Sequence, residues 1–204
     1  MRHTKTLGLL VLLTCLAACG QLTRPVPPPA AVEAALTATP PKPLSDAQQQ
    51  DFIQATQLLQ QGQFQAATLQ LVQLWSVLPE ASGIGYNLAL SQWQQGENAL
   101  AQHTLTELTQ RNANYAAAHN LAGVLARQQG QFRLAERHFK HAIAADANYG
   151  IAHKNLAILY ELYLAELLPA HYHYQQYYQL TQDQQAKIWL ALIQQQLEQG
   201  DAEN

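Results

Sequence analysis

Charged residues are scarce in this chain. They make up 12% of its 204 residues, with 11 lysines and arginines against 14 aspartates and glutamates. A globular domain usually carries about twice that share of charge. The formal net charge of −3 leaves no basic surface of the kind that binds nucleic acid or anionic lipid headgroups. Glutamine, which occurs 30 times, takes the place of the missing charge and suits exposed helix faces. The composition therefore argues against nucleic acid as a partner.

The first 18 residues have the layout of a secretory signal peptide. Arg2 and Lys5 give a positively charged start, and residues 7–16 form an apolar run. This run is too short to span a bilayer, which takes about 20 apolar residues. Small residues stand directly before Cys19, as they do before a signal-peptide cleavage point. We therefore predict a signal peptide at residues 1–18 that is removed from the mature protein.

Cysteine is also scarce, and its position is informative. The segment 16–19, Leu-Ala-Ala-Cys, resembles the lipobox of bacterial lipoproteins. The resemblance implies that diacylglycerol alkylates the Cys19 thiol, and that Cys19 becomes the lipidated N-terminus. Gly20 follows instead of aspartate, which implies the outer membrane, facing the periplasm. The alternative is an ordinary signal peptide that happens to contain cysteine. Because Cys15 is lost with the leader, we expect neither a disulfide nor a redox site.

Prolines are concentrated in one segment. Seven of the nine lie between residues 20 and 45: Pro25, Pro27, Pro28, Pro29, Pro40, Pro41 and Pro43. Proline fixes its own φ and lacks an N–H donor, so this segment favours extended polyproline II over a packed core. At about 3.1 Å per residue, it can hold a folded domain up to roughly 80 Å from a membrane. We predict a lipidated tether at residues 19–45, either a plain spacer or a proline-rich recognition motif.

A 34-residue period runs through the rest of the chain. Gly62, Gly96 and Gly130 are spaced by 34, and each follows a helical run that ends in glutamine. Three other positions repeat with the same period: a small residue seven before (Ala55, Ala89, Gly123, continued by Ala157), an alanine five after (Ala67, Ala101, Ala135), and a large apolar residue nine after (Leu71, Leu105, Phe139). Such a period is typical of a solenoid.

The pattern resembles the tetratricopeptide repeat (TPR), a pair of antiparallel helices. Small side chains are needed where two helices cross closely, and a glycine ends the first helix in the left-handed conformation. The resemblance implies an all-α fold, a right-handed solenoid of about four TPR helix pairs plus a C-terminal capping helix. We expect the pairs at 46–81, 82–115, 116–149 and 150–182, and the cap at 183–199. The helices are expected at 46–61, 64–78, 82–95, 98–111, 116–129, 132–145, 150–164 and 168–180.

The fourth copy and the cap depart from the strict repeat. Ala165, Ala170 and Tyr174 fit the register only if one residue is inserted between the two helices. Pro169 then falls in the first turn of the second helix, where its missing N–H is harmless. The cap carries a one-sided apolar stripe, made of Ala186, Trp189, Ile193 and Leu197.

The sequence offers no catalytic or metal-binding pattern. His138 and His141 have a spacing that could hold zinc, but no cysteine or HExxH element accompanies them, and a solvated helix face is the favoured interpretation. His119 and His153 are 34 apart, as packing in a repeat predicts. No nucleophile–base–acid order, phosphate-binding glycine loop or paired carboxylates are recognisable. We expect no enzyme, no metal and no cofactor.

The resemblance also implies where a partner binds, because the first helix of each TPR pair lines the concave face. Two rows of side chains fall there: Phe52, Tyr86, Asn120 and Lys154 in the first row, and Leu59, Trp93, Arg127 and Glu161 in the second row. The predicted partner-binding residues are Phe52, Tyr86, Trp93, Asn120, Arg127, Lys154 and Glu161. The alternative is that some of Phe52, Tyr86 and Trp93 pack inside the solenoid.

Tyrosines gather near the fourth copy, where six of nine lie within nineteen residues: Tyr160, Tyr163, Tyr172, Tyr174, Tyr177 and Tyr178. By register, Tyr174 and Tyr177 are core residues, while some of the others are expected at the surface. They are either filler for an irregular repeat or a second binding surface.

Together these features predict a membrane-anchored periplasmic scaffold for protein–protein interaction. Small TPR lipoproteins resemble assembly factors of type IV-like pili or secretion machines. The alternative is an adaptor that recruits peptidoglycan hydrolases or proteases to the outer membrane. Expected partners are envelope proteins and, through the lipid, the membrane; nucleic acid is not expected, and a homodimer stays open.

Overall fold

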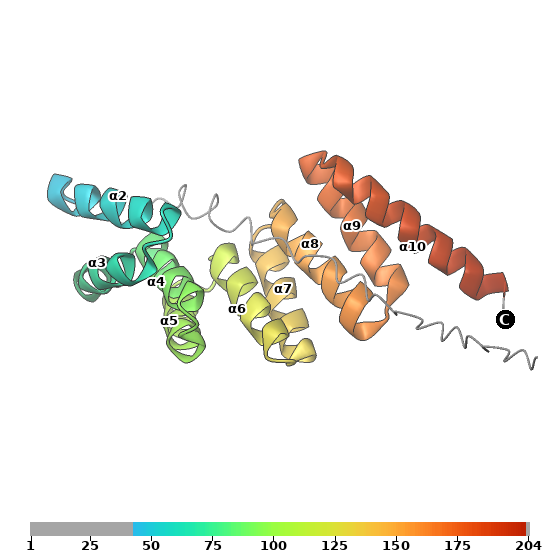
Figure 1. Ribbon diagram of the computed structural model, residues 1–204, viewed down its shortest axis with the longest axis horizontal. Coiled ribbons are helices and arrows are strands. Elements are labelled where there is room, and N and C mark those ends of the chain that lie inside the picture. The colour runs from blue at the N-terminus through green and yellow to red at the C-terminus, as the bar shows by residue number, and fades with distance from the viewer. Residues whose placement is uncertain (1–42, 203–204) are drawn as a thin grey trace, which may run out of the picture.

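The computed structural model describes residues 43–202, and this part of the chain is helical without any strand (Figure 1). The helices are α2 (Asp46–Gln60), α3 (Phe64–Val77), α4 (Ser82–Gln94), α5 (Asn98–Arg111), α6 (Ala116–Gln128), α7 (Phe132–Ala145), α8 (Gly150–Leu159), the π-helical turn η1 (Tyr160–Leu164), α9 (Leu167–Thr181) and α10 (Gln184–Ala202). The predicted signal peptide, Cys19 and the predicted tether up to residue 42 lie outside the described residues.

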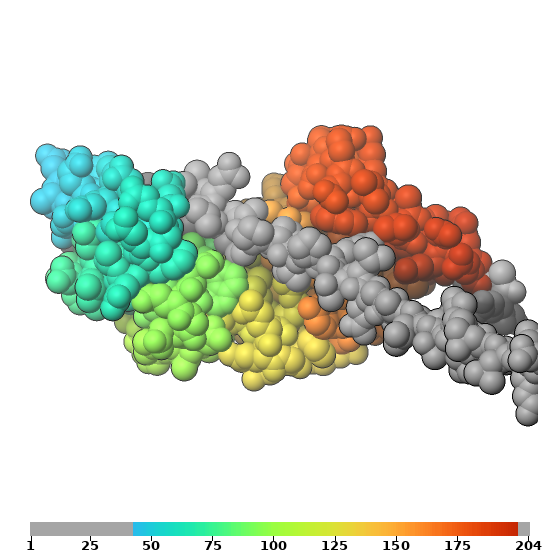
Figure 2. All heavy atoms as spheres, in the orientation of Figure 1, coloured from blue at the N-terminus to red at the C-terminus, as the bar shows by residue number. Residues whose placement is uncertain are grey.

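The helices form antiparallel pairs that stack one after another. The pairs are α2–α3, α4–α5, α6–α7 and α8–α9, and α10 packs against α9. Successive pairs follow a curved path from α2 to α10 (Figure 1), and the space-filling view shows the same succession along the long axis (Figure 2). This is the all-α solenoid that the 34-residue period predicts.

Each of the first three pairs turns at a left-handed glycine, as the sequence predicts. Gly62, Gly96 and Gly130 have φ values of 74°, 80° and 74°. At the first of these turns, the N–H of Gln63 donates to the carbonyl of Leu58 at 2.9 Å, and the N–H of Gly62 donates to Leu59 at 3.1 Å. These two bonds form a Schellman motif, which satisfies carbonyls that the end of the helix leaves free.

The fourth pair turns differently, and here the structure corrects the prediction. The inserted residue is absorbed at the end of the first helix, in η1, and not in the connection between the helices. A π-turn holds one more residue than an α-turn. Ala165 takes the left-handed conformation with φ 55° in place of glycine. Beyond it the register is restored, since Ala170 and Tyr174 are buried with 0% and 1% exposure.

The core forms at the repeating positions. The small residues predicted at the crossings are fully buried, and at Gly123 there is no room for a side chain: a Cβ there would lie 2.5 Å from Cε1 of Phe139. Trp93 packs against both halves of the core, so it connects the N-terminal and C-terminal pairs. In α10, Ala186 and Ile193 are fully buried, as the predicted stripe requires.

Candidate functional site: the inner row of helices

The first helices of the pairs form the inner layer of the solenoid. α2 contacts α4, α4 contacts α6, and α6 contacts α8. In α4 every residue from Ser82 to Gln92 is buried, and in α6 every residue from 120 to 127 is buried. The second helices bury only one face; α5, for instance, buries four of its residues. Both predicted rows of partner-binding residues therefore lie on the inner layer.

The first row lies deeper than predicted. Phe52 is partly buried against the core, and Tyr86 is fully buried, with its ring edge-on to Tyr115 at 6.0 Å between centroids. Burial, together with nearby Tyr149 and Tyr115, raises the pKa of the Tyr86 hydroxyl well above its usual value. The alternative interpretation of Tyr86 holds: its ring is part of the solenoid core and contacts Tyr115. We therefore remove Tyr86 from the set of accessible partner-binding residues.

Asn120 and Lys154 complete the first row. Asn120 is fully buried, and its Oδ1 accepts a hydrogen bond of 2.8 Å from Nδ2 of Asn155, which joins α6 to α8. Asn120 is thus a link between repeats, a role that its position in the repeat does not reveal. Lys154 is half-buried, with Nζ 5.1 Å from the centre of the Tyr177 ring. Burial lowers the pKa of Lys154, and the Asp183 carboxylate opposes this shift.

The second row runs over the C-terminal ends of the first helices. Leu59 is buried in the core. The indole N–H of Trp93 donates to Oε1 of Gln128 at 2.8 Å, which joins α4 to α6. The guanidinium of Arg127 lies 5.9 Å from the centre of the Tyr163 ring, and the Glu161 carboxylate accepts a hydrogen bond of 2.8 Å from the hydroxyl of Tyr174. Adjacent repeats therefore bring this row together.

Two aromatic residues that belong to neither predicted row lie beside the second row. Phe132 packs against Tyr163 with ring centroids 4.9 Å apart, and Tyr163 is 39% exposed. Phe132 stands two residues after Gly130, outside both predicted rows. Tyr163 belongs to the predicted tyrosine cluster, and its neighbours divide as the register predicts: Tyr174 and Tyr177 are buried, and Tyr172 is 52% exposed.

Five of the histidines form two small clusters, near the N-terminal ends of α6 and α8. Nε2 of His119 bonds the carbonyl of Ala113 at 2.8 Å, and the His119 ring lies 6.3 Å from that of His138 and 5.5 Å from that of His141. Burial, and then the neighbouring charges of His119 and His141, lowers the pKa of His138 to about 4. His138 is therefore neutral at physiological pH.

The second cluster joins α8 to α9. Nδ1 of His153 lies 3.0 Å from Nδ1 of His173, so one ring donates to the other. Burial, and then the charge on His153, lowers the pKa of His173 to about 4. Among the described residues, no group of three or more histidine, cysteine, aspartate or glutamate side chains is arranged to hold a metal ion. The two clusters are contacts between helices, α6 with α7 and α8 with α9.

A charged network ties α7 to the fourth pair. Glu136 bonds Lys140 at 2.7 Å, Arg133 at 2.9 Å and the hydroxyl of Tyr160 at 2.8 Å. Burial opposes the charge on Glu136, but the hydrogen bonds prevail and lower its pKa to about 2. Arg133 also bonds Glu166 at 3.0 Å. The network therefore connects α7 with η1 and with the residue before α9.

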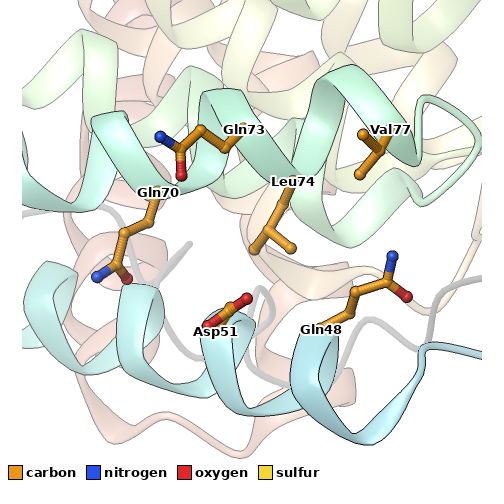
Figure 3. A pocket seen from close by; sticks show the side chains of 6 residues that line it. All are labelled: Gln48, Asp51, Gln70, Gln73, Leu74 and Val77. Carbon is orange, nitrogen blue, oxygen red and sulfur yellow. The ribbon is translucent and has the colours of Figure 1, made fainter.

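A pocket of about 300 Å³ lies between α2 and α3 (Figure 3). It is lined by Gln48, Asp51, Gln70, Gln73, Leu74 and Val77. Asp51 is the one ionisable group among these lining residues, and Figure 3 shows that α2 and α3 face each other across the pocket. A single carboxylate without a base or nucleophile beside it gives no catalytic arrangement.

Within residues 43–202, none of the helices combines the length and the apolar run that crossing a membrane requires. No protein-family model matches the chain, and no curated protein matches it.

The solved structures give clear matches in shape. PilF of Pseudomonas aeruginosa matches with a TM-score of 0.68 at 17% identity, over 76% of this chain and 70% of that chain. TTC0263, a thermophilic TPR protein of Thermus thermophilus, matches with a TM-score of 0.61 at 20% identity, over 74% of this chain and 82% of that chain. The type III secretion chaperone SycD of Yersinia enterocolitica, solved with a peptide of the translocator YopD, matches with a TM-score of 0.51 at 18% identity, over 55% and 91%.

At these identities the likeness shows the fold alone. The chain has the TPR solenoid fold. The fold says nothing by itself about which partner this chain binds.

Proposed function

We propose that this chain is a membrane-anchored, non-enzymatic scaffold of the bacterial cell envelope, and that it binds a protein partner along the second row. Lipid on Cys19 anchors it in the outer membrane, the tether spaces the solenoid from the lipid, and the solenoid faces the periplasm. The machine that it serves is a type IV-like pilus or a secretion system, which it helps to assemble.

The observation that carries the proposal is the continuity of the second row across repeats. Trp93 on α4 donates a hydrogen bond to Gln128 on α6. Arg127 on α6 lies over the ring of Tyr163 in η1, which follows α8. Tryptophan, tyrosine and arginine are the residue types that most often dominate the energy of protein interfaces. A row of them, held rigidly by three successive pairs, is suited to an extended segment of another protein.

The solved structures support the proposal at the level of fold. SycD, which shares the fold, is a secretion chaperone seen with a bound peptide of its translocator. PilF gives the highest TM-score of the three matches described above. A lipid anchor suits the same task, because tethering raises the local concentration of the scaffold near an envelope machine.

The anchor is tested by Cys19→Ser with radioactive palmitate labelling and membrane fractionation. We expect the wild-type chain to be labelled and to sediment with the outer membrane, and the variant to lose both properties. Cys15→Ser is the matched control and leaves both unchanged. A variant at Cys19 that keeps its label and its place in the membrane fraction would disprove the lipid anchor.

The partner is tested by cross-linked co-purification of the tagged full chain in mild detergent, with mass spectrometry of the retained proteins. We expect a pilus or secretion component that is lost with Trp93→Ala. Leu100→Ala is the control, since Leu100 is 53% exposed on a second helix. Retention of peptidoglycan hydrolases or proteases instead indicates the adaptor. Recovery of the same proteins with both variants contradicts a role for the second row.

A further inference from the structure

Arg127 differs from the other basic residues of the described chain. It is 6% exposed, and no lysine or other arginine within residues 43–199 is buried. Three of the exposed ones form ion pairs: Arg111 with Glu107, Arg133 with Glu136 and Glu166, and Lys140 with Glu136. Arg127 forms none with any described residue, and its Nη1 is buried without a hydrogen-bond acceptor. A buried cation without an anion is costly to a fold.

Its surroundings compensate the charge only in part. Arg127 lies in the last turn of α6, where the helix carbonyls favour a cation, and its guanidinium lies over the face of the Tyr163 ring. Burial lowers the pKa of Arg127, while the hydroxyls of Tyr163 and Tyr174 oppose this. Neither the ring nor the helix end accepts a hydrogen bond from Nη1. The position lacks a hydrogen-bonding anion.

From the unpaired Nη1 of Arg127 we infer that Arg127 receives the side-chain carboxylate of an aspartate or glutamate in an extended segment of the partner protein. A carboxylate matches the planar donors of a guanidinium and supplies the missing anion. The Tyr163 ring covers the guanidinium and Phe132 packs against Tyr163, so these two rings shield the ion pair from water. The inference rests on the proposed function, because it names the chemistry of the partner at the second row.

The test uses the purified full chain in mild detergent and two fluorescent peptide pools, both N-acetylated and C-amidated. The pools are random nonapeptides that differ only at the central position, which is glutamate in one and glutamine in the other. We expect the wild-type chain to bind the glutamate pool about tenfold more tightly in fluorescence anisotropy, as a charge-assisted hydrogen bond implies. Arg127→Gln removes this difference. Arg137→Gln, at an exposed position on α7, keeps it.

Thermal melting of Arg127→Met separates binding from folding. If the guanidinium awaits a partner's anion, the unliganded variant melts at the wild-type temperature or above it, since a costly buried charge is gone. A lower melting temperature for Arg127→Met overturns the inference, because the charge then stabilises the fold. So does a glutamate preference that survives Arg127→Gln, or a dimer in light scattering that Arg127→Gln dissociates, which would assign the site to a second copy of this chain.

The failure of this inference is distinguishable from failure of the scaffold. If both pools bind the wild-type chain equally and Trp93→Ala abolishes that binding, the proposed partner binding along the second row is supported. The inference that Arg127 recognises a carboxylate is then wrong. If neither pool binds the wild-type chain, the inference that Arg127 recognises a carboxylate is also wrong. The proposed scaffold function is then tested separately by the co-purification with Trp93→Ala.

Discussion

The contact between Gly123 and Phe139 gives the sharpest prediction about the fold. A Cβ at position 123 would lie 2.5 Å from Cε1 and 2.6 Å from Cδ1 of the Phe139 ring, and that ring is fully buried. Alanine is better than glycine inside a helix by about 0.8–1.0 kcal/mol. Overpacking a rigid core costs about 1–3 kcal/mol. We therefore expect Gly123→Ala to lower the free energy of unfolding by up to about 2 kcal/mol, since the clash exceeds the helix gain.

A double-mutant cycle isolates the clash. In a Phe139→Leu background the ring is absent, so Gly123→Ala keeps only its helix gain and stabilises by about 1 kcal/mol. The coupling between the two changes is then about 1–3 kcal/mol. Urea unfolding followed by far-ultraviolet circular dichroism and by tryptophan fluorescence measures it, provided that the two signals change together.

The control for the cycle is Gly130→Ala. Gly130 has φ 74°, and nothing lies within 4 Å of a Cβ built there, so the cost is backbone strain alone. We expect a loss of about 1–2 kcal/mol that is the same in both backgrounds. If Gly123→Ala stabilises the wild-type chain as much as it stabilises Phe139→Leu, the close crossing of α6 and α7 is wrong.

Two further predictions concern α8 and α9. The pKa of His173 in the folded chain is about 4, below the ordinary 6.5, so the unfolded chain takes up its proton first as the pH falls. The neutral His173 side chain therefore makes its full contribution to stability above pH 6.5, and this contribution is lost as the pH falls towards 4. After a discount for the partial exposure of His173, the loss is about 1–2 kcal/mol. Urea midpoints at pH 7 and pH 4.5 should differ less for His173→Phe than for wild type, while the exposed control His103→Gln keeps the wild-type difference. Ala165→Gly should raise the free energy of unfolding by about 0.5–1 kcal/mol, because Ala165 holds φ 55°; an unchanged or lower value would contradict the left-handed turn.

The sequence predicts the repeat and its turns because both follow from local rules. Glycine at a fixed spacing marks the left-handed caps, and the alanine and apolar positions follow from how two helices cross. The helix bounds of the first three pairs agree with the predicted ones to within about a residue, which is as closely as helix ends are defined.

The sequence does not predict what depends on contacts between repeats. The period gives Tyr86 and Asn120 the same position in successive repeats as Phe52, but it does not give their depth, which depends on how closely neighbouring repeats stack. The contact between His153 and His173 joins the two helices of the irregular fourth pair, whose register the π-turn shifts by one residue. Such a turn has no residue signature that fixes its place. For the same reason, the approach of Tyr163 to Arg127 was not predicted.

The central claim is that a protein partner lies along the second row, and site-specific photo-cross-linking in living cells tests it most directly. A benzophenone amino acid replaces Trp93 in one strain and the exposed Leu100 in another, both in the full-length chain. We predict a discrete adduct with one envelope protein from position 93, reduced by Arg127→Gln, and none from position 100. Equal adducts from both positions, or an adduct from position 100 alone, would contradict the account.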